Sequence, residues 1–267
     1  MYPNPYAPPT APMAPPPGFH PGGPGPWTVG DTLNSSWRAF ATAWAPLVFA
    51  PLLVGLVLAM PIFVIMGVFI GPAIGNPRGL VVVLQDPTLN AAMVGWNVIS
   101  IPAYAFLQPG IVKMRLCAVR NEAVQFGDLF SGGSSFAAML GVQIIIAGPG
   151  LAVSVLGVVG RFMGVPVLVQ ISSGLANIIL IVLMVLQALG LVFAEYYVVD
   201  RRQGSIEAIK NALALPSGDR ASVFGFFLVV GLIAVGGLMC CAFPGLVTLP
   251  YAGICVAMLY TRLAPPR

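Results

Sequence analysis

Long segments without charge constrain this chain more than any other feature of its sequence. Residues 45–75 contain no charged side chain, and neither do residues 221–261. A helix needs about 20 apolar residues to cross the hydrocarbon core of a bilayer, so each segment exceeds one span. Only 7% of the 267 residues are charged, whereas 58% are hydrophobic. A chain with so few polar side chains cannot cover a surface that faces water, and we expect the lipid bilayer to be its solvent.

Six transmembrane helices are expected from the apolar segments and the helix breakers between them. The expected spans are residues 45–75, 88–111, 136–160, 166–198, 222–241 and 246–260. The Phe-Pro-Gly sequence at 243–245 divides the last apolar segment into two spans. The Gly-Pro-Gly sequence at 148–150 predicts a kink or a locally opened helix in the third span. We therefore predict an all-α membrane protein in which six helices form three hairpins.

Short amphipathic segments precede the three expected hairpins, at residues 30–44, 126–130 and 204–214. In the first segment, large apolar side chains follow helical spacing, and Asp31 is the expected N-cap. These side chains are Leu33, Trp37, Phe40 and Trp44. Because tryptophan favours the headgroup layer, we expect interfacial helices here. The repeated order of segment, span, turn and span suggests three related hairpins.

The distribution of Lys and Arg predicts the orientation in the membrane. Arg78 and Arg161 follow the first and third expected spans, and all other basic residues lie on the opposite side of the expected topology. Those residues are Arg38, Lys113, Arg115, Arg120, Arg201, Arg202, Lys210, Arg220, Arg262 and Arg267. Cytoplasmic loops carry an excess of Lys and Arg. Both termini and the two long basic connectors are therefore expected in the cytoplasm.

Proline and glycine dominate residues 1–28, which contain no Lys or Arg. Because proline fixes φ and lacks an N–H donor, we predict a disordered cytoplasmic tail in front of a six-helix transmembrane domain at residues 29–263. Proline-rich segments can bind aromatic grooves, so one interpretation of the tail is a contact segment for a protein partner. The other interpretation is a plain solvated terminus. No basic region followed by an apolar region begins the chain, so no secretory signal peptide is predicted.

Two sets of side chains are candidates for function. The first set is basic, and we expect it to contact anionic lipid headgroups or a partner. It comprises Lys113, Arg115, Arg120, Arg201 and Arg202. The second set is a polar cluster within the expected spans, Asn97, Gln143, Asn177 and Glu195. It indicates either a polar path through the bundle or hydrogen bonds between helices. Glu195 fits either structural pairing near the basic connectors or a proton relay.

The residue inventory argues against several classes of protein. The four cysteines form no CxxC pair, and the one histidine, His20, lies in the tail, so no metal site is predicted. No HExxH, Walker A or GxSxG motif occurs. We expect neither enzymatic activity nor a cofactor. The net charge of +4 is explained by membrane topology, and no nucleic-acid partner is expected.

Three segments are similar to a family of uncharacterised six-span bacterial membrane proteins. FLQPGIVKMRLCAVRNEAVQFGDLFSGG, residues 106–133, resembles the connector of that family with its pattern G…R…RGE…DLF.GF. VVDRRQGSIEAIKNAL, residues 198–213, and GLMCCAFPGLVTLPYAGICVAMLYTRL, residues 237–263, resemble two later segments. The chain departs from the pattern at Asn121, where the family has glycine. The family is similar to the membrane domain attached to some glycerophosphoryl diester phosphodiesterases. The resemblance implies a bacterial inner-membrane location and no established activity.

Two classes of function remain open from the sequence. We expect a multi-pass, non-enzymatic protein that organises membrane lipids or binds partners at its basic cytoplasmic face. The alternative is a small-molecule or lipid transporter that uses the broken third span as a mobile element. A cavity lined by the four polar residues Asn97, Gln143, Asn177 and Glu195 would favour the transporter. A dry, closely packed bundle would favour the organising protein. The sequence indicates neither a substrate nor an oligomeric state.

Overall fold

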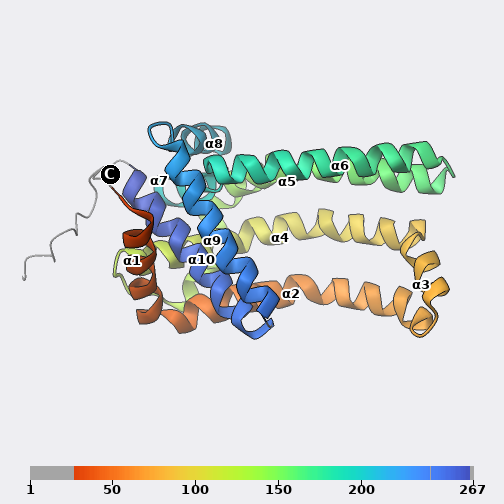
Figure 1. The fold of residues 1–267 in the computed structure, drawn as a ribbon, viewed down its shortest axis with the longest axis horizontal. Helices are drawn as coiled ribbons and strands as arrows, with labels where there is room; N and C mark the ends of the chain where they lie inside the picture. The colour runs from red at the N-terminus through yellow and green to blue at the C-terminus, as the bar shows by residue number, and fades with distance from the viewer. Residues whose placement is uncertain (1–26, 241, 265–267) are drawn as a thin grey trace, which may run out of the picture.

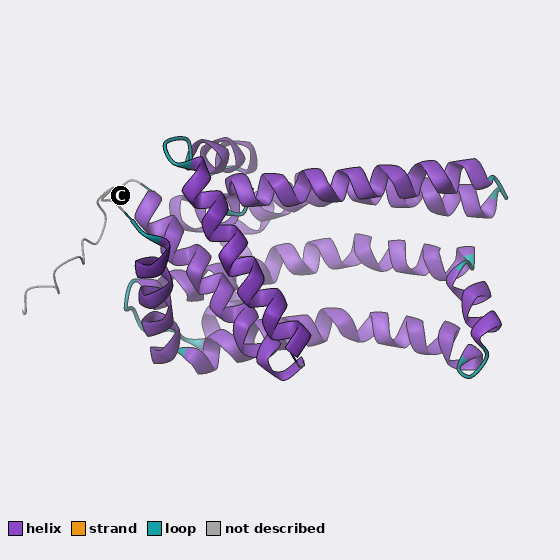
Figure 2. Cartoon of the chain, viewed as in Figure 1, coloured by secondary structure: helices purple, strands orange, loops and turns teal. Residues whose placement is uncertain are grey.

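The computed structural model describes residues 27–240 and 242–264, which form helices and no strand (Figures 1 and 2). The α-helices are α1 (Val29–Thr42), α2 (Trp44–Ile70), α3 (Pro77–Leu84), α4 (Pro87–Val119), α5 (Phe136–Phe162), α6 (Pro166–Leu186), α7 (Phe193–Arg201), α8 (Ser205–Ala214), α9 (Arg220–Cys240) and α10 (Ala242–Leu263). The short elements are η1 (Gly71–Ala73), η2 (Phe126–Ser135) and the π-helical η3 (Gln187–Leu191). The predicted all-α fold is confirmed.

Within the described residues, five helical segments are long and apolar enough to cross a membrane. They are Trp44–Ile70, Phe126–Phe162, Pro166–Leu191, Arg220–Met239 and Pro244–Leu263. Several apolar spans of this length are typical of a multi-pass membrane protein, as the sequence predicts. The helix α4 has 33 residues but is not among the five. Its interior carries Asn97, Ser100 and Gln108, which make it more polar than the other long helices.

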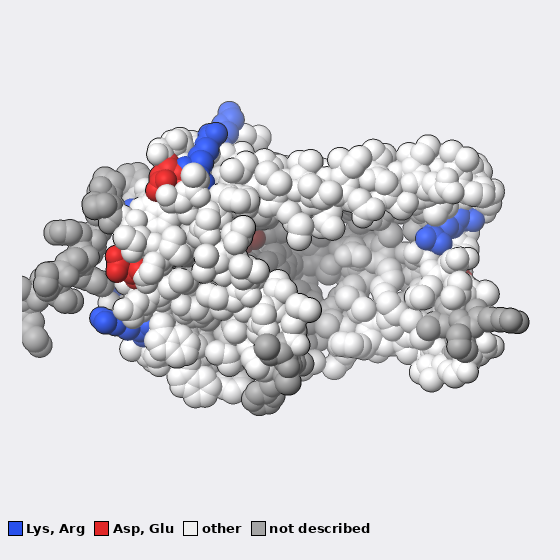
Figure 3. All heavy atoms as spheres, in the orientation of Figure 1, with Lys and Arg blue, Asp and Glu red and all other residues white. Residues whose placement is uncertain are grey.

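The long helices pair side by side (Figure 1). Helices α2 and α4 are joined at one end through η1 and α3, α5 lies along both α4 and α6, and α9 and α10 cross the others obliquely. Glycine allows the close approach of α5 to α6, because a Cβ atom at Gly160 would lie 2.7 Å from the Cβ atom of Leu168. On the face that Figure 3 shows, most charged atoms lie near the two ends of the molecule. The uncharged part between them suits the hydrocarbon layer.

The locally opened helix, one of the two outcomes expected at residues 148–150, is not found, and an interruption occurs elsewhere. Helix α5 continues through Pro149 from Phe136 to Phe162. Neighbouring helices and ordered polar groups often make proline tolerable inside membrane helices. The interruption lies instead within the expected fourth span, where Gly190 has a φ of 120° between α6 and α7. A side chain at Gly190 would also collide with the backbone oxygen of Ala212. Glycine therefore suits both the positive φ and the close approach of Ala212 at this position.

The N-terminal helix α1 presents a different face to the protein from the one its apolar spacing predicts. Phe40 is buried, as expected, but Trp37 and Trp44 are each 54% exposed. The buried positions also include Thr32 and Ser36, both fully covered by the fold. Hydrogen bonds explain this orientation, because Arg262 of α10 donates to the Thr32 hydroxyl at 3.0 Å. The two tryptophans therefore face outward, as headgroup-layer side chains do.

Only the last two residues of the expected N-terminal tail lie within the described residues. Trp27 packs edge-on against Phe226 of α9, with ring centroids 6.1 Å apart. The Thr28 side chain accepts the backbone N–H of Asp31 at 3.1 Å and so caps α1. The N-cap expected at Asp31 is therefore Thr28 instead. Residues 1–26, with the expected disorder and partner contact, lie outside the described residues.

The segment 106–133, which carries part of the family resemblance, folds back on itself. Its second half, η2, packs on α4 so closely that a side chain at Gly110 would collide with the backbone of Leu129. At the start of η2, Gln125 and Asp128 form a capping box. Lys113 of α4 forms an ion pair of 2.8 Å with Asp128. The connector is thus a compact unit that fixes the start of α5 against the end of α4.

Candidate functional site

Two adjoining cavities lie between α4, α5 and α6, with volumes of about 320 and 410 Å³. Asn97, Ser154 and Ala176 line both cavities, so we describe them together as the groove. The space-filling view shows a hollow between the layer of α5 and α6 and the layer of α2 and α4 (Figure 3). Sites for small molecules in proteins are usually clefts of about 300–1,000 Å³ with apolar walls and a few polar groups. The groove has this size and this mixed lining.

Helical spacing explains why polar side chains follow the groove. On α4, residues at intervals of seven or four share one face, and they are Asn90, Asn97, Ile101 and Gln108. On α5 the same intervals connect Gln143, Ala147, Ser154 and Arg161. Side chains at such intervals lie above one another on a helix. Each helix therefore carries one polar stripe, and the groove lies along the outer part of both stripes.

At one end of these stripes, a carboxylate joins three helices. Glu195 of α7 accepts a hydrogen bond from Nε2 of Gln108 at 2.6 Å and from Nε2 of Gln143 at 3.0 Å. Gln108 is buried, whereas Glu195 and Gln143 are half-buried. The guanidinium of Arg115 is near enough to interact electrostatically with Glu195. Two charged hydrogen bonds and a nearby cation make a carboxylate tolerable in an apolar bundle.

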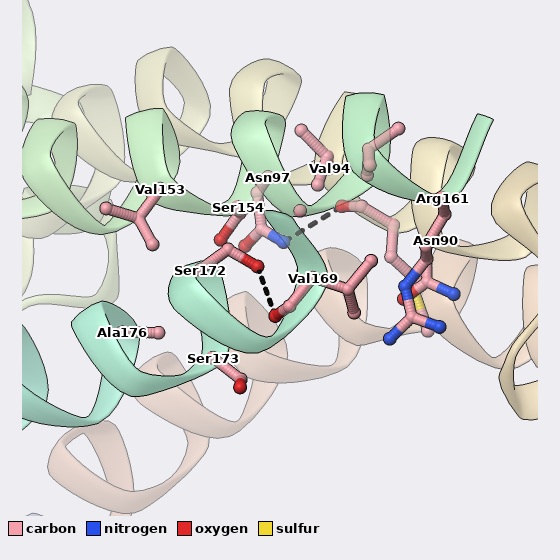
Figure 4. Close-up of a pocket in the computed structure, with 13 residues that line it drawn as sticks. Asn90, Val94, Asn97, Val153, Ser154, Arg161, Val169, Ser172, Ser173 and Ala176 are labelled. Atoms are coloured by element: carbon pink, nitrogen blue, oxygen red, sulfur yellow. Dashed lines mark hydrogen bonds between the residues drawn. The ribbon is translucent and has the colours of Figure 1, made fainter. Parts of the chain in front are cut away.

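The opposite end of the groove carries an arginine. Arg161 at the end of α5 donates from Nη1 to the backbone oxygen of Gln85 at 3.3 Å. Figure 4 shows Arg161 and Asn90 together at one end of the first cavity, and Asn97, Ser154 and Ser172 closer to its middle. Nearby Asp86 caps α4, and the N–H of Thr88, which donates to the Asp86 carboxylate, lowers the pKa of that carboxyl.

The predicted polar cluster divides into two parts in the structure. Asn97 and Asn177 both line the groove, and both residues are exposed. Gln143 and Glu195 bond to each other beyond its inner end. The predicted cluster of four left out Gln108, a polar residue of the second expected span, although its spacing of eleven residues from Asn97 places the two on one face of α4. Ser154, which lines the groove and whose hydroxyl donates to the Gly150 carbonyl within α5, was not predicted either.

Most of the predicted basic contact residues are engaged in contacts within the fold. Lys113 pairs with Asp128, and this hydrogen bond raises the pKa of Lys113. Arg120 pairs with Asp200 at 2.6 Å, and Arg201 lies 3.5 Å from the same carboxylate. The Tyr260 hydroxyl also donates a 3.1 Å hydrogen bond to Asp200.

Arg115 and Arg202 complete the predicted basic set. Arg115 packs against Gly253 of α10, where a Cβ atom would lie 2.5 Å from its guanidinium carbon. Arg202 is exposed and has a left-handed backbone with a φ of 53°. Of the five, Arg202 is therefore the side chain most open to a headgroup or a partner.

Within the described residues, no group of three His, Cys, Asp or Glu side chains is placed to hold a metal ion. Cys117 and Cys255 are free thiols, and Cys255 is buried.

No protein-family model matches the chain, and comparisons with curated proteins and with solved structures found no match either.

Proposed function

We propose that this chain is a six-span bacterial inner-membrane protein whose groove binds and transports an amphiphilic small molecule or lipid. Helix α4 would supply the sixth span, since its 33 residues are long enough and its polar side chains follow the groove. The described ends of the chain lie close together, because Arg262 of α10 contacts α1. This closeness supports an even number of spans arranged as three hairpins. The surplus of basic residues at that end supports cytoplasmic termini.

One observation carries the proposal of transport. A groove of mixed polar and apolar lining extends between α4, α5 and α6, and the polar stripes of α4 and α5 continue past it to Glu195. A bundle stabilised only by close packing has no need of polar side chains that recur along one face of two helices. Membrane transporters commonly bind their substrates between helices whose backbone is interrupted. Here the interruption at Gly190 lies five residues before Glu195.

This interruption also suggests how the inner end would open. Helix α7, which carries Glu195, is connected to α6 through η3. The two amides that donate to Glu195 belong to α4 and α5. A substrate hydroxyl or amine can replace either amide as the donor to the carboxylate. We propose that this exchange releases α7 from α4 and α5 while η3 serves as the hinge. Hinges of this kind are a few residues at the ends of secondary-structure elements.

The organising protein expected from the sequence is the second candidate. Its support is a set of exposed cations at the proposed cytoplasmic end, namely Arg38, Arg202, Lys210 and Arg220. Each such residue near an anionic leaflet contributes about 1 kcal/mol of attraction. The family resemblance is compatible with both candidates, since it implies no activity.

A translocation assay distinguishes the two candidates. The purified full chain is reconstituted into vesicles that contain fluorescent phosphatidylglycerol, and the movement of that lipid between leaflets is followed by a membrane-impermeant quencher. We expect translocation above that of protein-free vesicles. Ala176→Trp, which fills the groove where both cavities meet, should abolish it. The matched control is Ala152→Trp, because Ala152 is exposed on α5 and lines neither cavity. Equal rates with and without protein would contradict transport of this lipid and favour the organising protein.

A further inference from the structure

The charge distribution of the groove is uneven along its length. Arg161 is the one charged residue among those that line the two cavities within the described part of the chain. Its described contact is a single hydrogen bond to the Gln85 carbonyl, at 3.3 Å. No described carboxylate lies within 4.0 Å of its guanidinium. A guanidinium has five N–H donors, so most of its capacity is available to a ligand.

Asp86 follows Gln85, the partner of Arg161, directly in the chain but forms no ion pair with Arg161. The Oδ1 atom of Asp86 accepts the backbone N–H groups of Thr88 and Leu89, at 2.6 and 3.4 Å. Asp86 therefore acts as the N-cap of α4. The amide of Asn90 is likewise turned to its own helix, where it donates to the Asp86 carbonyl at 2.7 Å. Arg161 remains the group in this region with unused donors that face the groove.

Beyond Asn97, the second cavity becomes mainly apolar. Its walls include Ile101, Leu151, Leu180 and Leu183. Its polar residues beyond Asn97 are Asn177 and two serines, Ser100 and Ser154, whose hydroxyls already donate to carbonyls of their own helices at 3.0 and 2.8 Å. The groove therefore offers one cationic position at the end marked by Arg161 and an apolar channel that extends inward from it. The carboxylate of Glu195 beyond the inner end disfavours a second anionic group there.

We infer that the ligand of the groove is an anionic amphiphile, with a phosphate or carboxylate head at Arg161 and a hydrocarbon chain between α4, α5 and α6. This inference rests on the proposed function and adds the chemical class of the substrate. Arginine binds phosphate and carboxylate groups through paired N–H donors, which favours such a head over a neutral one. The apolar walls favour a chain over a free inorganic anion, because each buried methylene adds about 0.8 kcal/mol.

Equilibrium binding to the purified full chain in a neutral detergent tests the inference with a matched series of probes. The probes are hexadecyl phosphate, hexadecanol, hexadecyltrimethylammonium and inorganic phosphate. We expect hexadecyl phosphate to bind at least tenfold more tightly than the other three. Arg161→Gln should weaken that binding about tenfold, the effect of losing a hydrogen bond to a charged group, and leave hexadecanol unchanged. Arg161→Lys keeps the charge and should weaken it less. Arg38→Gln, an exposed arginine outside the groove, should have no effect.

Each other outcome overturns a definite part of the account. If hexadecanol binds as tightly as hexadecyl phosphate and Arg161→Gln changes neither, the anionic head is wrong while the groove remains the site. If inorganic phosphate binds as tightly as hexadecyl phosphate, the ligand is a free anion and the amphiphile is wrong. If Ala176→Trp changes the binding of no hexadecyl probe, the groove is not the site, and the proposed function fails together with the inference.

Discussion

Gln108 of α4 donates a hydrogen bond of 2.6 Å to Glu195 of α7, which is 87 positions later in the chain. Gln143 of α5 donates to the other oxygen of the same carboxylate at 3.0 Å. Three helices that are distant in sequence therefore meet at one side chain. This contact holds α4, α5 and α7 together at the point where the polar stripes of α4 and α5 converge.

Removing Gln108 should destabilise the protein. Gln108→Leu leaves one oxygen of the half-buried Glu195 carboxylate without its donor, and a lost hydrogen bond to a charged group costs about 1.5–3 kcal/mol. We expect a lower thermal unfolding midpoint in detergent, measured by the fluorescence of a thiol-reactive dye or by light scattering. Gln170→Leu is the control, because Gln170 is an exposed glutamine of α6 whose side chain has no described hydrogen bond. Equal midpoints for the two variants would show that the bond contributes little.

A methyl group at Gly110 should disturb the connector between α4 and α5. The backbone of Leu129 occupies the space that a Cβ atom would need, so Gly110→Ala must displace η2 from α4. Overpacking of this kind costs about 1–3 kcal/mol. Gly95→Ala is the control in the same helix, since nothing lies within 4 Å of that position. We expect the yield of folded, monodisperse protein to fall for the first variant and to be unchanged or higher for the second. The reverse order would contradict the packing of η2 on α4.

The ion pair between Lys113 and Asp128 predicts a dependence of stability on alkaline pH. The hydrogen bond to Asp128 raises the pKa of Lys113 above its ordinary value of 10.5 in the folded state. The stabilisation is therefore fully present below pH 10.5 and is lost as the pH rises through the higher folded-state pKa.

Lys113→Met should remove this part of the alkaline decrease in the unfolding midpoint. Lys210→Met is the control, because Lys210 is exposed and has no described ion pair. If the difference between wild type and Lys113→Met stays constant from pH 8 to the alkaline limit, the pair does not contribute in this way.

Labelling of single cysteines tests the proposed orientation. Met163 is 68% exposed after α5, and Ile206 is 65% exposed on α8, so both positions accept cysteine without loss of core packing. In a background that lacks the native cysteines, an impermeant maleimide added to intact cells should label Met163→Cys. Ile206→Cys should react only after the membrane is opened. Labelling in the opposite order would show that the orientation is inverted.

Five of the six expected spans coincide with helices of the described residues that are long and apolar enough to cross a membrane, because a span depends on local composition. The charge-free segment 45–75 overlaps the helix Trp44–Ile70, and the break at 243–245 falls next to the start of α10 at Ala242. Proline at position 244 is compatible with the first turn of a helix, which explains the small shift. The effect of proline and glycine within the spans was harder to predict, because it depends on packing against other helices. Pro149 lies within a continuous helix, whereas Gly190 interrupts one.

The candidate site was harder to predict than the spans because it depends on contacts between distant helices. The sequence showed that Asn97, Gln143, Asn177 and Glu195 are polar residues in apolar segments. It could not show that two of them line a groove while the other two bond to each other, because this depends on how each helix is rotated. Likewise, Lys113 and Arg120 looked like surface cations, yet each has a carboxylate partner brought to it by folding.

The most direct test of the account is to map where an amphiphile binds. The purified full chain is illuminated with a hexadecyl phosphate that carries a photoreactive diazirine in its chain, and the labelled peptides are identified by mass spectrometry. The account predicts saturable labelling of the groove walls, around Ile101, Leu151 and Leu180, that unlabelled hexadecyl phosphate competes away. Ala176→Trp should abolish this labelling, and Ala152→Trp should preserve it. Labelling spread over the exposed faces of α2 and α9, with no saturable component in the groove, would contradict the central claim.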